Sequence, residues 1–241
     1  MPKSRYLVGI SAVKLELESP PVKSVLKGSE FMTPLVKWAN AFAGTTVAIL
    51  ACIEFVDRPV ALLFQKTVTR PDALTTFTHA PDPLLPLAAA VFLGLGFWSL
   101  SGRILSRAQN CVMLSSISLM IADIMKEELK LAFGRTWPDT WLGNNPSFLR
   151  DGVYGFHFFH GGRAYASFPS GHMAVTCAVL SVLWFFYPAW RTVYVIVGVP
   201  VAAGLVGANY HFVSDVIAGS FVGISIGWML TSVWNATGHR T

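Results

Sequence analysis

The sequence is poor in charged residues. Asp, Glu, Lys and Arg make up 13% of its 241 residues, against roughly a quarter in soluble domains. Hydrophobic residues make up 53%, which is more apolar surface than the interior of a soluble domain can hide. The other solvent available to such a surface is the hydrocarbon of a bilayer. The composition therefore excludes an ordinary soluble enzyme and predicts an integral membrane protein.

Cysteine is also scarce, and the three cysteines (Cys52, Cys111 and Cys177) lie within apolar runs. They do not have the spacing of metal ligands, so we interpret them as small residues that face lipid or the protein core. We predict neither a metal nor a cofactor. The net charge of +5 comes from basic residues that are not gathered into a stripe, so nucleic acid is not an expected partner.

What the chain does contain is a series of apolar segments that approach the roughly 20 residues needed to span a bilayer. These segments are residues 35–55, 84–101, 108–125, 173–187, 192–208 and 216–234. They predict an all-α, polytopic membrane bundle of about six transmembrane helices. We assign residues 1–33, which are mixed and polar, to an N-terminal cytoplasmic tail, and residues 34–241 to the membrane-embedded domain.

The connections between these segments differ in length. Residues 103–107 and 188–191 form tight turns, whereas residues 56–83 and 135–171 are long and rich in Pro, Gly and aromatic residues. Long irregular segments usually carry binding functions. The arginines in the short turns place those turns in the cytoplasm by the positive-inside rule. We therefore expect a plasma or inner membrane protein whose long loops, and active site, face outward.

The most informative motif is the run of residues 168–172, Phe-Pro-Ser-Gly-His, directly before an apolar helix. The amide groups around Ser170 and Gly171 would open that helix, and a helix N-terminus binds anions. His172 lies in the first turn, where it could donate a proton to a leaving oxygen. An ordinary helix cap at the membrane interface, with a solvated His172, would have the same sequence.

A second motif pairs His211 with Asp215 at the start of the last apolar segment. The i, i+4 spacing puts both side chains on one face of a helix. There the carboxylate can hold one ring nitrogen and leave the other free to attack, and histidine can itself be phosphorylated as a nucleophile. The pair could also simply mark the membrane interface, although an ionisable pair at membrane depth is a functional hypothesis by default.

A third motif, residues 126–138, closes the third apolar segment with cations. Cations at a helix C-terminus complement the helix dipole, and this account suffices for Lys126. Lys130 and Arg135 could instead reach a phosphate, as a point charge and a two-pronged donor. Counting spans places all three motifs on the same side of the membrane, so we predict that they form one site.

In this order the motifs resemble those of the type 2 phosphatidic acid phosphatase family. Its members carry a lysine segment ending in Arg-Pro, then Pro-Ser-Gly-His, then Ser-Arg, five residues, His, three residues and Asp. Here Pro-Ser-Gly-His is intact at residues 169–172, and His211 with Asp215 matches the end of the last motif. The family's six-span layout also fits the apolar segments.

The resemblance implies that His211 is the nucleophile, Asp215 its orienter, and His172 the general acid and later base. It also implies that Lys130 binds phosphate together with the amides around Ser170 and Gly171, and that no metal is needed.

Two positions depart from the family pattern. Trp137 stands where the family has the arginine of Arg-Pro, and Leu205, after a glycine, stands where it has Ser-Arg. Two phosphate-binding arginines are therefore absent, and an arginine clamp contributes several kcal/mol to phosphoryl transfer. We regard Arg135 and Arg163 as candidates to bind phosphate in their place, and Asn209 as a further donor near His211.

The predicted function is hydrolysis of a lipid phosphate or isoprenoid diphosphate through a phosphohistidine intermediate. The expected partners are a phosphorylated lipid and the membrane, and the sequence does not predict the oligomeric state. Two alternatives stay open: transfer of the head group to another alcohol, and a catalytically silent member that binds a phospholipid. A transporter has less support, because no inverted repeat or pair of broken helices is evident.

Overall fold

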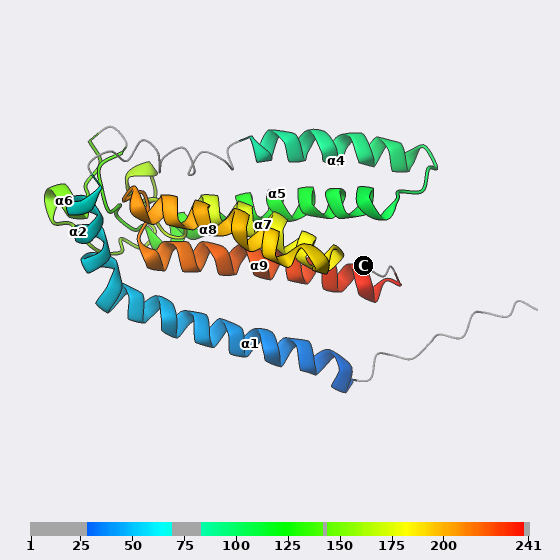
Figure 1. Cartoon of the computed structure of the whole chain (residues 1–241), viewed down its shortest axis with the longest axis horizontal. Helices are drawn as coiled ribbons and strands as arrows, with labels where there is room; N and C mark the ends of the chain where they lie inside the picture. Colours follow the sequence, from blue (N-terminus) through cyan, green and yellow to red (C-terminus); the bar gives the residue numbers. More distant parts are fainter. Residues whose placement is uncertain (1–27, 69–82, 142–143, 239–241) are drawn as a thin grey trace, which may run out of the picture. The chain divides into compact units, whose positions relative to one another are not determined.

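The computed structural model describes residues 28–68, 83–141 and 144–238. All the regular secondary structure in these ranges is helical, apart from isolated bridges in the long loop (Figure 1). The predicted all-α class is therefore confirmed. The chain divides into two compact units, Met1–Ala41 and Phe42–Thr241, and the second contains all the helices from α2 onward.

The helices follow the apolar segments of the sequence. They are α1 (Gly28–Ala51), α2 (Asp57–Thr67), α4 (Leu84–Leu100), α5 (Arg107–Phe133), the short α6 (Phe148–Asp151), α7 (Gly171–Phe186), α8 (Arg191–Gly207) and α9 (Val213–Ala236). Each of the six predicted segments coincides with one of them. The predicted tail lies outside the described residues up to position 27, and its last residues belong to α1.

The first long connection is partly helical, which the sequence did not indicate. A π-helical turn, Cys52–Val56, leads directly from α1 into α2. The predicted loop therefore begins with an ordered helix, and its remainder, residues 69–82, lies outside the described residues. This turn is what directs the buried side chain of Asp57 to the end of the bundle.

Three helical stretches in the described part of the chain are long and apolar enough to cross a membrane by length and composition. They are Arg107–Phe133, Pro188–Gly207 and Val213–Ala236. Helices α4 and α7 are apolar but have 17 and 16 residues, somewhat short of the roughly 20 that a span requires. The count of six spans stays a prediction.

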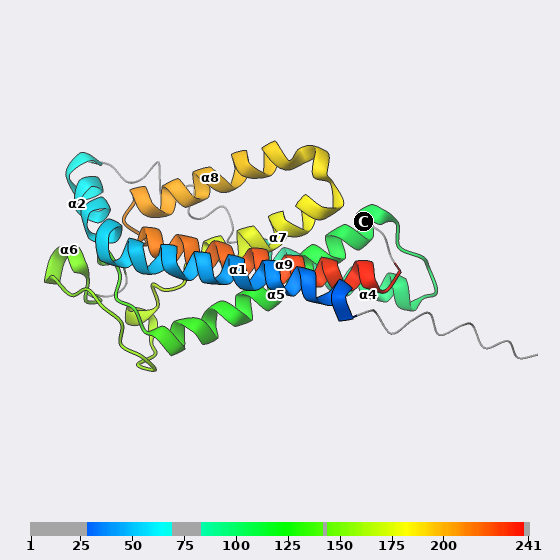
Figure 2. The same cartoon turned by 90° about the horizontal axis from the view of Figure 1, so that it is seen from below.

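Helix α7 packs against α9 and α5, and α4 packs against α5 (Figures 1 and 2). Glycines on one face of α9 allow the backbone of α7 to lie close to it. A Cβ added to Gly219 would lie 2.3 Å from the Ser170 carbonyl oxygen, and one added to Gly223 would lie 2.2 Å from that of Ala174. Small residues let membrane helices approach backbone to backbone, and here they fix the start of α7 against α9.

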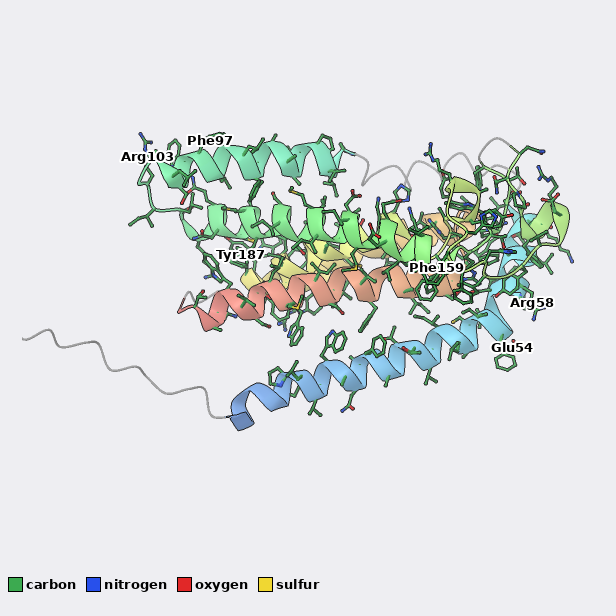
Figure 3. The ribbon with its side chains drawn as sticks, turned by 180° about the vertical axis from the view of Figure 1, so that it is seen from behind. Glu54, Arg58, Phe97, Arg103, Phe159 and Tyr187 are labelled. Atoms are coloured by element: carbon green, nitrogen blue, oxygen red, sulfur yellow. The ribbon has the colours of Figure 1, made fainter. Side chains whose placement is uncertain are left out.

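The two ends of this unit differ in character. Arg103 and Tyr187 mark the end with the short turns, and Arg58 and Phe159 mark the end with the long loops (Figure 3). At the first end the guanidinium of Arg103 lies 4.1 Å from the ring centroid of Trp98. The long segment between α5 and α7 covers the other end, where the three sequence motifs meet.

Candidate active site

A cavity of about 200 Å³ lies where the long-loop end of α5, the start of α7 and the start of α9 come together. It is lined by Leu85, Leu119, Asp123, Lys126, Lys130, Trp137, Gly171, His172, Val175, Tyr210 and His211. All three motifs contribute to this list. The structure therefore brings the three motifs together at one cavity, and the side of the membrane on which they lie stays a prediction.

The Pro-Ser-Gly-His motif forms the turn into α7. Helix α7 begins at Gly171, so that His172 lies in its first turn, where helix amides lack intrahelical partners. Ser170 does not line the cavity. Its amide donates to the Asp215 carbonyl oxygen at 3.0 Å and its side chain is fully buried. Phosphate binding by this turn would therefore use the amides that follow Ser170, which differs from our expectation.

The His211 side chain is buried and lines the cavity. Its Nδ1 lies 3.5 Å from Oδ2 of Asp215, and this nitrogen makes no hydrogen bond among the described residues. Burial lowers the pKa of His211, and this effect outweighs the Asp215 carboxylate, which raises it. A lowered pKa favours the neutral imidazole, the state in which a ring nitrogen can act as a nucleophile.

Asp215 is held in place by donors from several segments. Its Oδ2 accepts a hydrogen bond from Oγ of Ser167 at 2.7 Å and from the amide of Phe212 at 3.0 Å. Its other oxygen, Oδ1, pairs with the Arg135 guanidinium. The sequence suggested the orienting role of Asp215 but nothing about Ser167, which carries no motif of its own.

The position of Arg135 contradicts our expectation that it binds phosphate. Its side chain is fully buried and does not line the cavity. It donates to Oδ2 of Asp57 at 2.8 Å, to Oγ of Ser214 at 2.6 Å, and to Asp215. Burial lowers the pKa of Arg135, but Asp215 and Asp57 together raise it above its ordinary value. This arginine pairs with the carboxylate that lies beside His211 and does not line the cavity.

Asp57 is the member of this network that sequence reasoning missed. It is 1% exposed, pairs with Arg135 and accepts a hydrogen bond from the amide of Ser214 at 3.0 Å. Tyr154 joins the same network, since its hydroxyl accepts from Arg135 at 3.0 Å and donates to the Ile53 carbonyl oxygen at 2.6 Å. In the sequence, the only signal for Asp57 is its position as a carboxylate directly after an apolar segment.

The two positions that lack the family's arginines have taken other roles. Trp137 lines the cavity, with its ring centroid 5.2 Å from that of His211, and its Nε1 donates to the Arg163 carbonyl oxygen at 2.9 Å. Leu205 is fully buried among Met173, Val201 and Val216. Trp137 therefore forms a wall of the cavity beside His211, and Leu205 is part of the core.

Arg163 and Asn209 are absent from the lining of the cavity that His172 and His211 share. Arg163 lines a neighbouring cavity of about 210 Å³ that shares Lys130 with the first. The Asn209 side-chain amide donates to the Ala61 carbonyl oxygen at 3.2 Å. The structure therefore gives Arg163 no contact with the cavity of the two histidines, and phosphate binding by Arg163 stays a prediction.

Within the described residues, no three His, Cys, Asp or Glu side chains cluster as metal ligands would. Metal-independent chemistry stays a prediction.

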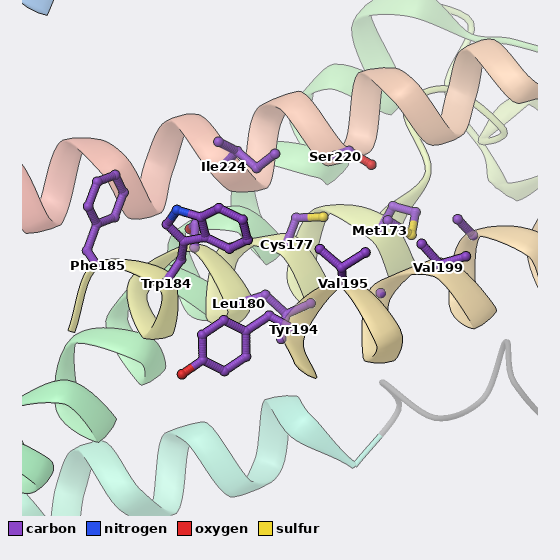
Figure 4. A pocket seen from close by; sticks show the side chains of 13 residues that line it. Met173, Cys177, Leu180, Trp184, Phe185, Tyr194, Val195, Val199, Ser220 and Ile224 are labelled. Atoms are coloured by element: carbon purple, nitrogen blue, oxygen red, sulfur yellow. The ribbon is translucent and has the colours of Figure 1, made fainter. Parts of the chain in front are cut away.

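A larger cavity of about 480 Å³ lies between α7, α8 and α9 (Figure 4) and is lined by side chains that carry no charge, such as Cys177, Leu180 and Trp184. No histidine, carboxylate or lysine lines it, so it does not hold the charged groups that the three motifs bring to the smaller cavity.

One end of this membrane bundle carries a histidine beside a carboxylate, a second histidine and two lysines. These groups are typical of a phosphate-binding site, and comparison with known proteins identifies the family. The family model of the PAP2 superfamily matches residues 112–238. This chain therefore belongs to the PAP2 superfamily. With its apolar helices, it is an integral membrane protein.

Two curated relatives are similar to part of the chain. One is the lipid A 1-phosphatase of Rhizobium etli, 30% identical over 118 residues, which are 48% of this chain and 47% of that protein. The other is the lipid A 1-phosphatase of Rhizobium johnstonii, 29% identical over 102 residues, 42% of this chain and 39% of that protein. The chain thus spans about half the length, or less, of the curated relatives it matches.

One solved structure has a similar fold. It is the crystal structure of the first transmembrane PAP2 type phosphatidylglycerolphosphate phosphatase from Bacillus subtilis, with a TM-score of 0.52 and 19% identity. The similarity covers 83% of this chain and 96% of that one, and it supports the helical membrane architecture.

Proposed function

We propose that this protein is a membrane phosphatase that hydrolyses a lipid phosphate or an isoprenoid diphosphate through a phosphohistidine on His211. One observation carries the proposal: His172, His211 and Lys130 come from separate segments and line one small cavity. A site of about 200 Å³ with two histidines and a buried carboxylate behind one of them has the groups that two-step phosphoryl transfer requires.

In the first step a ring nitrogen of His211 attacks phosphorus and the bond to the leaving oxygen breaks. Because Nδ1 lies toward Asp215, the attacking atom is Nε2. His172 protonates the leaving oxygen. It can reach the same substrate as His211, because the ring centroids of the two histidines lie 6.2 Å and 6.0 Å from that of Tyr210. Lys130 and the first amides of α7 balance the charge on the transferred phosphoryl oxygens.

In the second step water attacks the phosphohistidine while His172 accepts a proton from it, and inorganic phosphate leaves. The buried network behind His211 contains one cation, Arg135, and two carboxylates, Asp57 and Asp215. Its net negative charge stabilises the positive charge that develops on the imidazole during attack. This is the role of the carboxylate in catalytic triads.

An amphiphilic substrate is supported by the composition of the cavity wall. Lysines and histidines line one part, whereas Leu85, Leu119 and Val175, from α4, α5 and α7, line another. A phosphate can bind the first part while the attached hydrocarbon lies along the second. The names of the curated relatives, which are lipid A 1-phosphatases, support a lipid substrate as well.

Arginines in the short turns at the opposite end of the unit support a site that faces outward.

Phosphate release by the purified protein from a panel of lipid phosphates, with a chelator present, tests the proposal. We expect His211→Asn to lower the rate by at least about 10³-fold, with little loss of stability. His160→Asn, at an exposed loop histidine, is the matched control and should retain activity. Release that the chelator abolishes, or that survives in His211→Asn, would contradict the mechanism.

A catalytically silent lipid-binding protein is the second candidate, because Trp137 and Leu205 remove two cations that the family pattern provides. That function predicts no phosphate release by the wild type, together with lipid binding that persists in His211→Asn. Adding alcohol acceptors to the same assay distinguishes hydrolysis from transfer, since a transferase would form a new phosphate ester in place of inorganic phosphate.

A further inference from the structure

Helix α5 presents one polar stripe to the histidine cavity. Leu119, Asp123, Lys126 and Lys130 line the cavity together, as expected for residues spaced three and four apart on one helical face. Lys130 corresponds to the lysine of the family motif. Lys126 lies one turn earlier. Its position near the C-terminus of α5 suggested that it complements the helix dipole, but that role does not explain why it lines the same cavity as the histidines.

The ammonium groups of the two lysines converge on the start of α7. A Cβ placed on Gly171 would lie 3.4 Å from Nζ of Lys126 and 3.4 Å from Nζ of Lys130. Both groups therefore lie beside Gly171, the first residue of α7, next to His172. Glycine at position 171 is what allows this approach, because a larger side chain would collide with the Lys126 stem at 2.9 Å.

Acidic partners hold both lysines in this position. Nζ of Lys126 lies 2.6 Å from Oδ1 of Asp123 and 3.5 Å from Oε1 of Glu127, and Nζ of Lys130 lies 3.0 Å from the same Glu127 oxygen. An ammonium group has three N–H donors. A single short contact with Asp123 therefore leaves Lys126 donors for another anion.

The cavity needs this second cation. The transferred phosphoryl group spreads its charge over three oxygens, and the positions of the family's two arginines hold Trp137 and Leu205. The two terminal nitrogens of Arg135 pair with Asp57 and Asp215, outside the cavity. Among the described residues that line the cavity, the cations other than histidine are Lys126 and Lys130.

We propose that Lys126 is a second phosphate-binding residue, which acts with Lys130 in place of the missing arginine clamp. The ammonium of Lys126, oriented by Asp123, donates to a non-bridging oxygen of the substrate phosphate. Lys130 and the amides at the start of α7 donate to the others. This inference rests on the proposed phosphatase function and assigns that site a residue outside the motif.

Binding of inorganic phosphate, measured by calorimetry on the detergent-solubilised protein, tests the inference without turnover. We expect Lys126→Met to weaken phosphate binding about 10- to 100-fold, the effect of losing a charge-assisted hydrogen bond. Lys126→Arg, which keeps the charge, should restore most of the affinity. Lys66→Met, at an exposed lysine of α2, should bind as the wild type does.

Kinetics separate a phosphate-binding role from a structural one. Loss of Lys126 should raise KM for the lipid phosphate and lower kcat, with the unfolding temperature nearly unchanged. If Lys126→Met proves unstable, Lys126→Gln provides a second neutral variant. Phosphate affinity equal to the wild type in a folded neutral variant would overturn the inference, and so would a wild type that binds no phosphate.

The two proposals can fail separately. Weakened phosphate binding in Lys126→Met, in a protein that releases no phosphate from lipids, would support the inference and contradict hydrolysis. Lipid phosphate hydrolysis that Lys126→Met leaves unchanged would support hydrolysis and contradict the inference.

Discussion

Two charged clusters flank His211, and they differ in burial. The buried cluster consists of Arg135, Asp57 and Asp215, whose side chains are 0% exposed. The open cluster consists of Lys126, Lys130, Asp123 and Glu127, whose side chains are 16% to 59% exposed. The buried cluster holds the carboxylate that lies beside His211, whereas Asp123, Lys126 and Lys130 of the open cluster line the cavity together with His211.

The difference in burial separates positioning from binding. Charges removed from water tolerate no loss of a partner, because an unpaired buried charge is costly, so the buried cluster keeps one arrangement and holds Asp215 against His211. Partly exposed ion pairs contribute little to stability, so the lysines of the open cluster can exchange an acidic partner for a phosphate at small cost.

Replacing Arg135 with Met should have the largest effect, because it removes the one cation of the buried cluster. It leaves Asp57 and Asp215 buried without their shared cation, so we expect the free energy of unfolding to fall by about 3–5 kcal/mol, with loss of activity. Lys130→Met in the open cluster should lower it by about 1 kcal/mol or less. Thermal unfolding of both purified variants provides the measurement, and equal stabilities would contradict the distinction.

Replacing Ser167 with Ala sharpens the comparison without removing a charge. It deletes the 2.7 Å hydrogen bond to Oδ2 of Asp215, the oxygen nearest His211. Because hydrogen bonds to charged groups contribute about 1.5–3 kcal/mol, we expect kcat to fall about 10- to 100-fold while KM changes little. Lys126→Met should affect KM as well. A Ser167→Ala variant that changes KM alone would place Ser167 in substrate binding.

Replacing Tyr154 with Phe tests the edge of the buried cluster. The hydroxyl donates to Ile53 and accepts from Arg135, and burial raises the pKa of Tyr154 to about 12, so it remains protonated and can donate. Loss of these bonds should cost about 1 kcal/mol of unfolding free energy. Chemical denaturation measures this change, and the phosphate affinity of the variant should stay that of the wild type.

The smallest expected effect is on pH dependence. The pKa of His211 in the fold lies below its ordinary value of 6.5, so below pH 6.5 the unfolded chain binds a proton there that the folded protein does not. Stability should therefore fall as the pH drops below 6.5, and His211→Gln should make this fall shallower. An unchanged slope in that variant would show that His211 is not held neutral.

The local parts of the site could be predicted from the sequence. The pairing of His211 with Asp215 follows from an i, i+4 spacing, and the place of His172 follows from a Pro-Ser-Gly turn before an apolar run. The role of Arg135 could not be predicted in this way. Gly134, at φ 58°, ends α5 and turns the chain. Arg135 then meets Asp57, which lies 78 positions earlier.

The sequence by itself therefore determined the membrane class, the apolar segments that become helices, and the motifs that gather at one end of the bundle. These features depend on composition and on spacing within one helix or turn. Only the tertiary structure decided which cations face the cavity and which are buried. That choice depends on partners far apart in the sequence, since a guanidinium is stable in the interior only where packing brings carboxylates to it.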